Sequence, residues 1–105
     1  KKHYDSDVFN MPSEIYQKFM GVSKKIVKML KKGLKVNRVA MVMEGMGINH
    51  AHIKLYPLHG VGKEFQEMWA ENEIYFNKYE GYISTQLGPK KSIEELNIVA
   101  DKIKN

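Results

Sequence analysis

Residues 36–57 constrain the fold more than any other stretch, because they predict two paired strands joined by a short turn. The first strand is expected over Val36–Glu44, where an apolar run leaves almost no polar interruption, so both faces should be covered. Gly45 and Gly47 then favour a tight turn. A second strand is expected from Asn49 to Leu55 or slightly beyond, ending near Pro57. These features predict an α+β domain built around an antiparallel sheet.

The second predicted strand alternates basic and apolar residues. Because side chains in a strand alternate between two faces, one face would carry three basic groups and the other three apolar ones. Three basic groups on one face repel each other when charged, and an anionic ligand such as phosphate would offset this cost. The basic residues are His50, His52 and Lys54, and the apolar ones are Ala51, Ile53 and Leu55.

The remaining elements follow from apolar spacing and capping residues. A long amphipathic helix is predicted from Ser13 to Lys32, after Pro12, with Gly33 as its C-terminal cap. A last helix is predicted from Ser92, the N-cap of a capping box with Glu95, to about Lys104. Between them, we expect a helix over residues 63–77 and a short strand or extended arm over residues 79–87.

Size and composition limit the classes of protein. The 105 residues suffice for one domain, spanning residues 1–105, with a modest core. No apolar run approaches the roughly 20 residues that cross a membrane, and without cysteine there is no disulfide, so we expect a cytoplasmic protein. The net charge is +5, from 17 lysines and arginines against 12 acidic residues. Only one of the 17 is an arginine, which favours a solvated helix face over a nucleic-acid groove.

The basic segment resembles the motif of the histidine-triad (HIT) superfamily, His-φ-His-φ-His-φ-φ with φ apolar. Here it reads His50-Ala-His52-Ile-Lys54 after a glycine turn, and Lys1-Lys2-His3-Tyr4 resembles the Pro-Lys-x-His stretch that precedes the long helix in that family. The resemblance covers residues 1 to about 60. It implies a HIT-like fold, an antiparallel sheet with a long helix, from which N-terminal strands are expected to be missing.

The resemblance also implies an activity. HIT proteins bind nucleotides and hydrolyse or transfer at the α-phosphate, which makes His52 the expected covalent nucleophile and His50 a contact to the phosphate or the leaving group. Lys54 departs from the third histidine, but other branches carry glutamine there, so we expect it to contact phosphate. Backbone N–H groups around Gly45 to Asn49, including Gly47, are expected to cradle phosphate oxygens, with His3 nearby. No metal or cofactor is required, and a homodimer is expected.

The same residues are compatible with several other functions. The protein can instead be a non-catalytic nucleotide-binding or scaffold protein, or a basic nucleic-acid module. Asn49 is either a ligand contact or only a turn residue. His50 and His52 can also form a zinc site with His59 or Glu44. Trp69 and the tyrosines are expected in the core or a dimer contact rather than stacked on a base; the tyrosines in question are Tyr75, Tyr79 and Tyr82.

Overall fold

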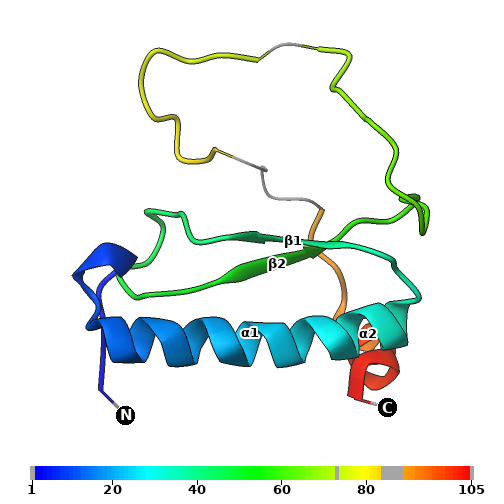
Figure 1. Ribbon diagram of the computed structural model, residues 1–105, viewed down its shortest axis with the longest axis horizontal. Helices are drawn as coiled ribbons and strands as arrows, with labels where there is room; N and C mark the ends of the chain where they lie inside the picture. Colours follow the sequence, from blue (N-terminus) through cyan, green and yellow to red (C-terminus); the bar gives the residue numbers. More distant parts are fainter. Residues whose placement is uncertain (1, 73, 84–88, 105) are drawn as a thin grey trace.

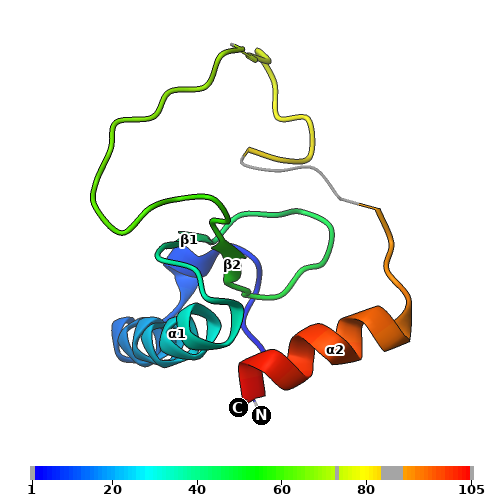
Figure 2. The same ribbon diagram turned by 90° about the vertical axis from the view of Figure 1, so that its right-hand side faces the viewer.

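The computed structural model describes residues 2–72, 74–83 and 89–104, and these form a small α+β fold with two α-helices and a two-stranded antiparallel sheet. Helix α1 lies along one face of the hairpin, and the segment after β2 extends from the other side (Figures 1 and 2). The elements, in chain order, are the 3-10 helix η1 (Val8–Asn10), α1 (Ser13–Leu34), β1 (Val39–Val42), β2 (Lys54–Pro57) and α2 (Ile93–Lys104).

The long helix α1 begins where it was predicted and ends slightly later. Pro12 is its N-cap, and the Tyr16 N–H donates to the Pro12 carbonyl oxygen over 2.9 Å. The predicted cap at Gly33 is wrong, because α1 continues to Leu34 and Lys35 takes the left-handed conformation at φ 53°. The N–H of Lys35 donates to the carbonyl of Lys31, which satisfies one of the free carbonyls of the last turn.

Gly33 has a packing role instead. A Cβ at this position would lie 2.2 Å from the carbonyl oxygen of Lys102 and 2.8 Å from the Cα of Ile103, both in α2. The absence of a side chain therefore lets the C-terminal end of α1 approach the backbone of α2. Helix α2 itself begins as predicted, since Ser92 Oγ accepts from the Glu95 N–H at 3.2 Å and Glu95 accepts from the Ser92 N–H at 2.9 Å.

The two strands are shorter than predicted. They pair antiparallel with Val42 opposite Lys54 and Val39 opposite Pro57. Residues before Lys54 therefore have no partner on β1, which ends at Val42, and they adopt no strand conformation. Pro57 is the last residue of β2, as expected for a proline at the end of an edge strand.

The buried side chains lie in α1 and in the segments directly before and after it. Ser23 of α1 is buried and donates its hydroxyl to the Met20 carbonyl at 2.7 Å, which satisfies its polar group, and the hydroxyl lies 3.8 Å from the sulfur of Met41. Met41 therefore points toward α1, while Lys54 and its neighbours at alternate positions point to the opposite face. The buried apolar residues are Val8, Met11, Leu30 and Val36.

The predicted helix over residues 63–77 is wrong for the described residues of that stretch, which contain no helix. An amphipathic helix needs a surface on which to bury its apolar face, and here the large apolar side chains remain exposed. They are Phe65, Met68, Trp69, Ile74 and Tyr75. Of the predicted strand or arm over residues 79–87, residues 79–83 form no strand, and residues 84–87 lie outside the described part.

Within the described residues, neither helix combines the length and the apolar character that crossing a membrane requires.

Candidate functional site

The basic segment borders a cavity of about 950 Å³. This volume is near the upper end of the roughly 300–1,000 Å³ typical of small-molecule sites. All three basic residues contribute to it, together with the glycine turn on one side and two residues from the distant segment 81–82 on the other. The lining residues are Gly45, Met46, Gly47, Ile48, His50, His52, Lys54, Tyr56, Gly81 and Tyr82.

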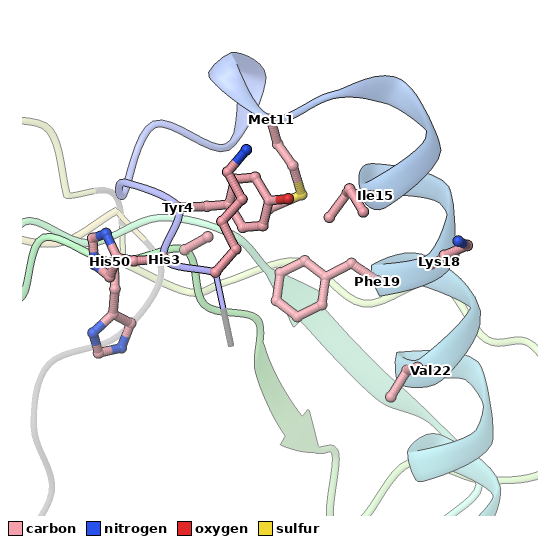
Figure 3. A pocket seen from close by; sticks show the side chains of 10 residues that line it. His3, Tyr4, Met11, Ile15, Lys18, Phe19, Val22 and His50 are labelled. Atoms are coloured by element: carbon pink, nitrogen blue, oxygen red, sulfur yellow. The ribbon is translucent and has the colours of Figure 1, made fainter.

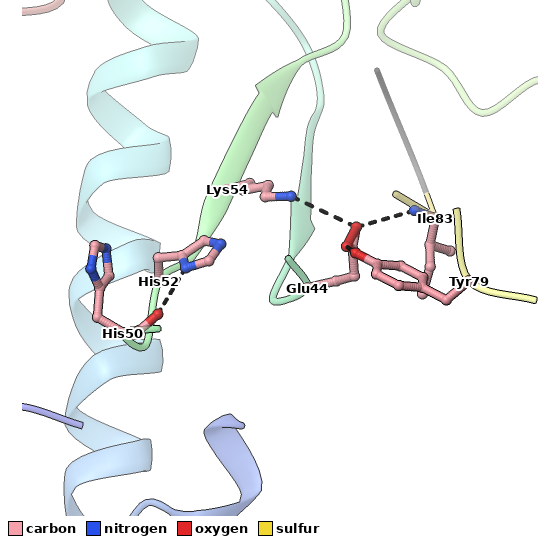
Figure 4. Close-up of polar contacts among 6 residues, drawn as sticks. All are labelled: Glu44, His50, His52, Lys54, Tyr79 and Ile83. Atoms are coloured by element: carbon pink, nitrogen blue, oxygen red, sulfur yellow. Dashed lines mark hydrogen bonds and ion pairs between the residues drawn. The ribbon is translucent and has the colours of Figure 1, made fainter. Parts of the chain in front are cut away.

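The backbone that carries the histidines differs from the prediction. Only Lys54 lies on a strand, whereas His50 and His52 lie in the loop that precedes β2. This loop is attached to the N-terminal segment, because the Ala51 N–H donates to the carbonyl oxygen of Tyr4 at 2.8 Å. In Figure 4, His52 lies between His50 and Lys54, so the order of the three side chains is kept although the strand is not.

Gly45 is the point at which His52 and Lys54 meet. A Cβ on Gly45 would lie 3.0 Å from Nε2 of His52 and 3.2 Å from Nζ of Lys54. The residue has φ +146°, a conformation that side chains with a Cβ rarely adopt. The glycine turn therefore leaves space directly beside two nitrogen atoms, and one small anion there can contact both.

The ring of His52 has a defined orientation. Its Nδ1 lies 2.9 Å from the carbonyl oxygen of His50 (Figure 4). A carbonyl oxygen can only accept a hydrogen bond, so Nδ1 carries the hydrogen and the neutral ring has its lone pair on Nε2. That lone pair lies beside Gly45, in the cavity, which is the arrangement that an imidazole nucleophile requires.

His50 stands between two cavities. Its ring is edge-on to that of His52, with the centroids 5.6 Å apart, and it also borders a second cavity of about 380 Å³ against α1. His3 lines this second cavity and not the first (Figure 3). His3 therefore shares the second cavity with His50 but does not border the cavity that contains His52 and Lys54. The other side chains of the second cavity are largely apolar and include Met11, Ile15, Phe19 and Val22.

The two remaining predicted phosphate contacts differ. Gly47 borders the large cavity, where its backbone is available to a ligand. Asn49 does not border it, and its Oδ1 accepts from both the N–H and the hydroxyl of Ser6, at 3.0 and 3.2 Å. Asn49 therefore holds the N-terminal segment against the loop that carries His50 and His52.

Lys54 has an anionic neighbour that the motif does not predict. Its Nζ lies 3.7 Å from Oε1 of Glu44, which follows β1 by two residues. Oε2 of Glu44 accepts from the Tyr79 hydroxyl at 2.5 Å, and Oε1 accepts from the Ile83 N–H at 3.1 Å (Figure 4). The bond from Tyr79, followed by that from Ile83, lowers the pKa of Glu44, while the same carboxylate raises the pKa of Tyr79.

The zinc alternative has no assembled ligand set. Among the described residues, no three side chains of histidine, cysteine, aspartate or glutamate are grouped to hold a metal ion. Glu44 instead forms an ion pair with Lys54 and accepts a hydrogen bond from Tyr79. His59 lies exposed in the turn after β2.

Three further residues lie at or beside the cavity, and sequence reasoning did not assign them to the predicted phosphate site. They are Glu44, Tyr79 and Tyr82. Tyr79 and Glu44 are 35 positions apart, and no motif spacing links them. Tyr82 borders the cavity, whereas Trp69 and Tyr75 are exposed rather than in a core. Only the polar character of Glu44 at the end of an apolar strand gave a local signal.

No protein-family model, curated protein or solved structure matches this chain. The geometry of the site therefore carries the functional argument.

Proposed function

We propose that this chain is a nucleotide phosphohydrolase or nucleotidyl transferase of the histidine-triad type, acting at the α-phosphate through a covalent nucleotidyl-histidine on His52. The observation that carries the proposal is that His52 Nε2 and Lys54 Nζ both border the space at Gly45, in an open cavity. A nucleophile and a cation that share one anion-sized space match the needs of phosphoryl chemistry.

The reaction proceeds in two displacements. Nε2 of His52 attacks the α-phosphorus, a P–N bond forms, and the bond from phosphorus to the leaving group breaks. The imidazole then carries a positive charge, which the His50 carbonyl stabilises through the Nδ1–H hydrogen bond of 2.9 Å. Water in a hydrolase, or a second acceptor in a transferase, attacks the phosphorus next. A P–O bond forms, the P–N bond breaks, any proton on the attacking oxygen passes to solvent, and the imidazole departs with its original tautomer restored.

Lys54 stabilises the non-bridging phosphate oxygens as negative charge develops on them. Its ammonium group offers three donors and a full charge. The ion pair with Glu44 holds Nζ at the rim of the cavity, and a phosphate that arrives there competes with this carboxylate for the ammonium group. His50 borders the same cavity and contacts the phosphate or the leaving group.

A second candidate function is nucleotide binding without turnover. The ion pair between Lys54 and Glu44 favours it, because it fixes a permanent charge where the resemblance places a third histidine. Calorimetry that detects binding of a nucleoside monophosphate, combined with no hydrolysis across a panel of nucleotides, would select this candidate. A covalent adduct on His52 would eliminate it.

The HIT-like fold and the homodimer belong to the same proposal. Exposed apolar side chains in the segment after β2, such as Phe65, Met68 and Trp69, are suited to burial against a second copy. Sedimentation equilibrium tests this: we expect a mass near twice the 12.2 kDa of the chain, and a monomer at all concentrations would refute the dimer.

The test of the activity compares His52→Ala with His59→Ala on nucleoside phosphoramidates and dinucleoside polyphosphates. His59 is exposed in the turn after β2 and does not border the cavity, which makes it a matched histidine control. We expect His52→Ala to abolish turnover while binding of a nucleoside monophosphate is largely retained, and His59→Ala to behave as the unsubstituted chain. Undiminished turnover by His52→Ala would reject the proposal.

A further inference from the structure

The phosphate site has a second wall that comes from a distant part of the chain. Gly81 and Tyr82 border the same cavity as His52 and Lys54, although about 30 residues separate them in the sequence. Among the described residues 74–83, Tyr82 is the one that is not exposed. Its ring packs edge-on against Phe76, with the centroids 6.2 Å apart. The wall therefore contributes an aromatic residue, supported by Phe76, to the lining of the cavity.

The carboxylate of Glu44 binds this wall at two points. Glu44 accepts hydrogen bonds from Tyr79 and from the backbone of Ile83, the residues that bracket Gly81 and Tyr82. Hydrogen bonds to an ionised acceptor are about twice as strong as neutral ones. The same carboxylate is paired with Lys54, so the wall and the phosphate-contacting cation share one anchor.

We infer that Tyr82 and its anchor Glu44 make the site selective for phosphates that carry a planar aromatic group, such as a nucleoside 5′-monophosphate, over phosphates that carry none. This inference rests on the proposed function for the position of the phosphate. The cavity of about 950 Å³ is far larger than one phosphate, and its donors cluster at the glycine turn and the basic residues. With the phosphate there, the rest of the ligand extends into the space that Tyr82 borders.

The physical basis of the selectivity is stacking. An aromatic side chain that stacks on a base contributes an affinity equivalent to about one order of magnitude, as judged by alanine substitution. A sugar phosphate without a base has no flat face to offer and gains none of this. Glu44 and Tyr79 act as positioning residues, since they hold the wall that carries Tyr82 without contacting the aromatic group.

Calorimetry with adenosine 5′-monophosphate and ribose 5-phosphate tests the wall, because the two ligands share the phosphate and the ribose. We expect Tyr82→Ala to weaken the first ligand about tenfold and to leave the second unchanged. Tyr82→Phe keeps the ring and should retain the selectivity. Tyr75→Ala is the control on the same segment, because Tyr75 is 87% exposed and does not border the cavity.

The role of Glu44 as an anchor is tested with Tyr79→Phe, which removes only the hydroxyl that donates a hydrogen bond to Glu44. We expect a smaller loss of selectivity in the same direction, with ribose 5-phosphate affinity unchanged. A merely structural role would weaken both ligands together. Equal losses for both ligands in Tyr82→Ala, a similar loss in Tyr75→Ala, or an unsubstituted chain that does not prefer the nucleotide would each overturn the inference.

Failure of the wall and failure of the proposed chemistry give different results. Selective nucleotide binding without any adduct on His52 removes the covalent mechanism and leaves the wall intact. An adduct on His52 together with equal affinity for the two ligands would refute the inference about Tyr82 and would support the covalent mechanism.

Discussion

Replacing Gly45 with alanine tests how the glycine turn supports the site. At φ +146°, a residue with a Cβ is strained, at a cost of about 1–3 kcal/mol in folding stability. The added methyl would also stand 3.0 Å from His52 Nε2 and 3.2 Å from Lys54 Nζ, so both side chains must move by a few tenths of an ångström. His52 is not free to swing, because its Nδ1 is held by the His50 carbonyl.

Two effects on activity follow from this crowding. The methyl group occupies the space in which the phosphate is expected, and it displaces the nucleophile from its hydrogen-bonded position. A misplacement of about 1 Å costs on the order of a hundredfold in rate, so we expect kcat/KM to fall about ten- to a hundredfold in Gly45→Ala. Steady-state kinetics on a nucleoside phosphoramidate measure this, and urea denaturation measures the stability separately.

Gly60 provides a control with the same backbone strain but without the crowding. It has φ +83°, and a Cβ there meets nothing within 4 Å. Gly60→Ala should therefore lose about 1–2 kcal/mol of stability and keep its kcat/KM. Equal kinetic losses in the two variants would refute the argument that Gly45 acts through His52 and Lys54, because the loss would then follow stability alone.

Three further predictions follow from the packing and the charges. Gly33→Ala should destabilise the fold by about 1–3 kcal/mol, because the added methyl group clashes with the backbone of α2. Gly21→Ala, where nothing lies within 4 Å, should stabilise the fold by up to about 1 kcal/mol. Changes of the same sign in the free energy of unfolding, measured by denaturation, would contradict this. Because the pKa of Glu44 is lowered, the stabilisation from its ionised carboxylate should be complete above the ordinary pKa of 4.5 and be lost as the pH falls through the lowered value. A pKa of Glu44 at or above 4.5, measured by NMR titration, would disprove this. Lys54→Met should weaken nucleotide binding at least about tenfold by calorimetry, while Lys54→Gln, which retains a donor, should lose less; equal losses would indicate that donors at this position are unimportant.

The sequence predicted α1 and the start of α2 because their signals are local. Apolar spacing, Pro12, and the capping box of Ser92 and Glu95 act within a few residues of each other. Gly33 was misjudged because its role depends on α2, about 70 residues away, which no local pattern can show.

The sequence also brought the three basic residues of the predicted site together through a local pattern. Alternation placed His50, His52 and Lys54 near one another, and all three border one cavity. The strand is shorter than predicted, because a strand needs a hydrogen-bonded partner and β1 ends opposite Lys54. Glu44 and Tyr79 meet only in the folded chain, so the spacing of residues in the sequence could not predict their hydrogen bond.

The segment after β2 shows where apolar pattern alone misleads. Phe65, Met68 and Trp69 have helical spacing, but in the structure they are exposed and form no helix. Periodicity predicts a helix only when another surface covers its apolar face.

Mass spectrometry of the quenched reaction tests the central claim most directly. The chain is mixed with a nucleoside phosphoramidate, stopped in the first turnover under conditions that preserve the P–N bond, and digested for peptide mapping. We predict a mass increase of one nucleotidyl group on the peptide that contains His52, and none in His52→Ala. Turnover by the unsubstituted chain with no such adduct, or with the adduct on another residue, would contradict the account.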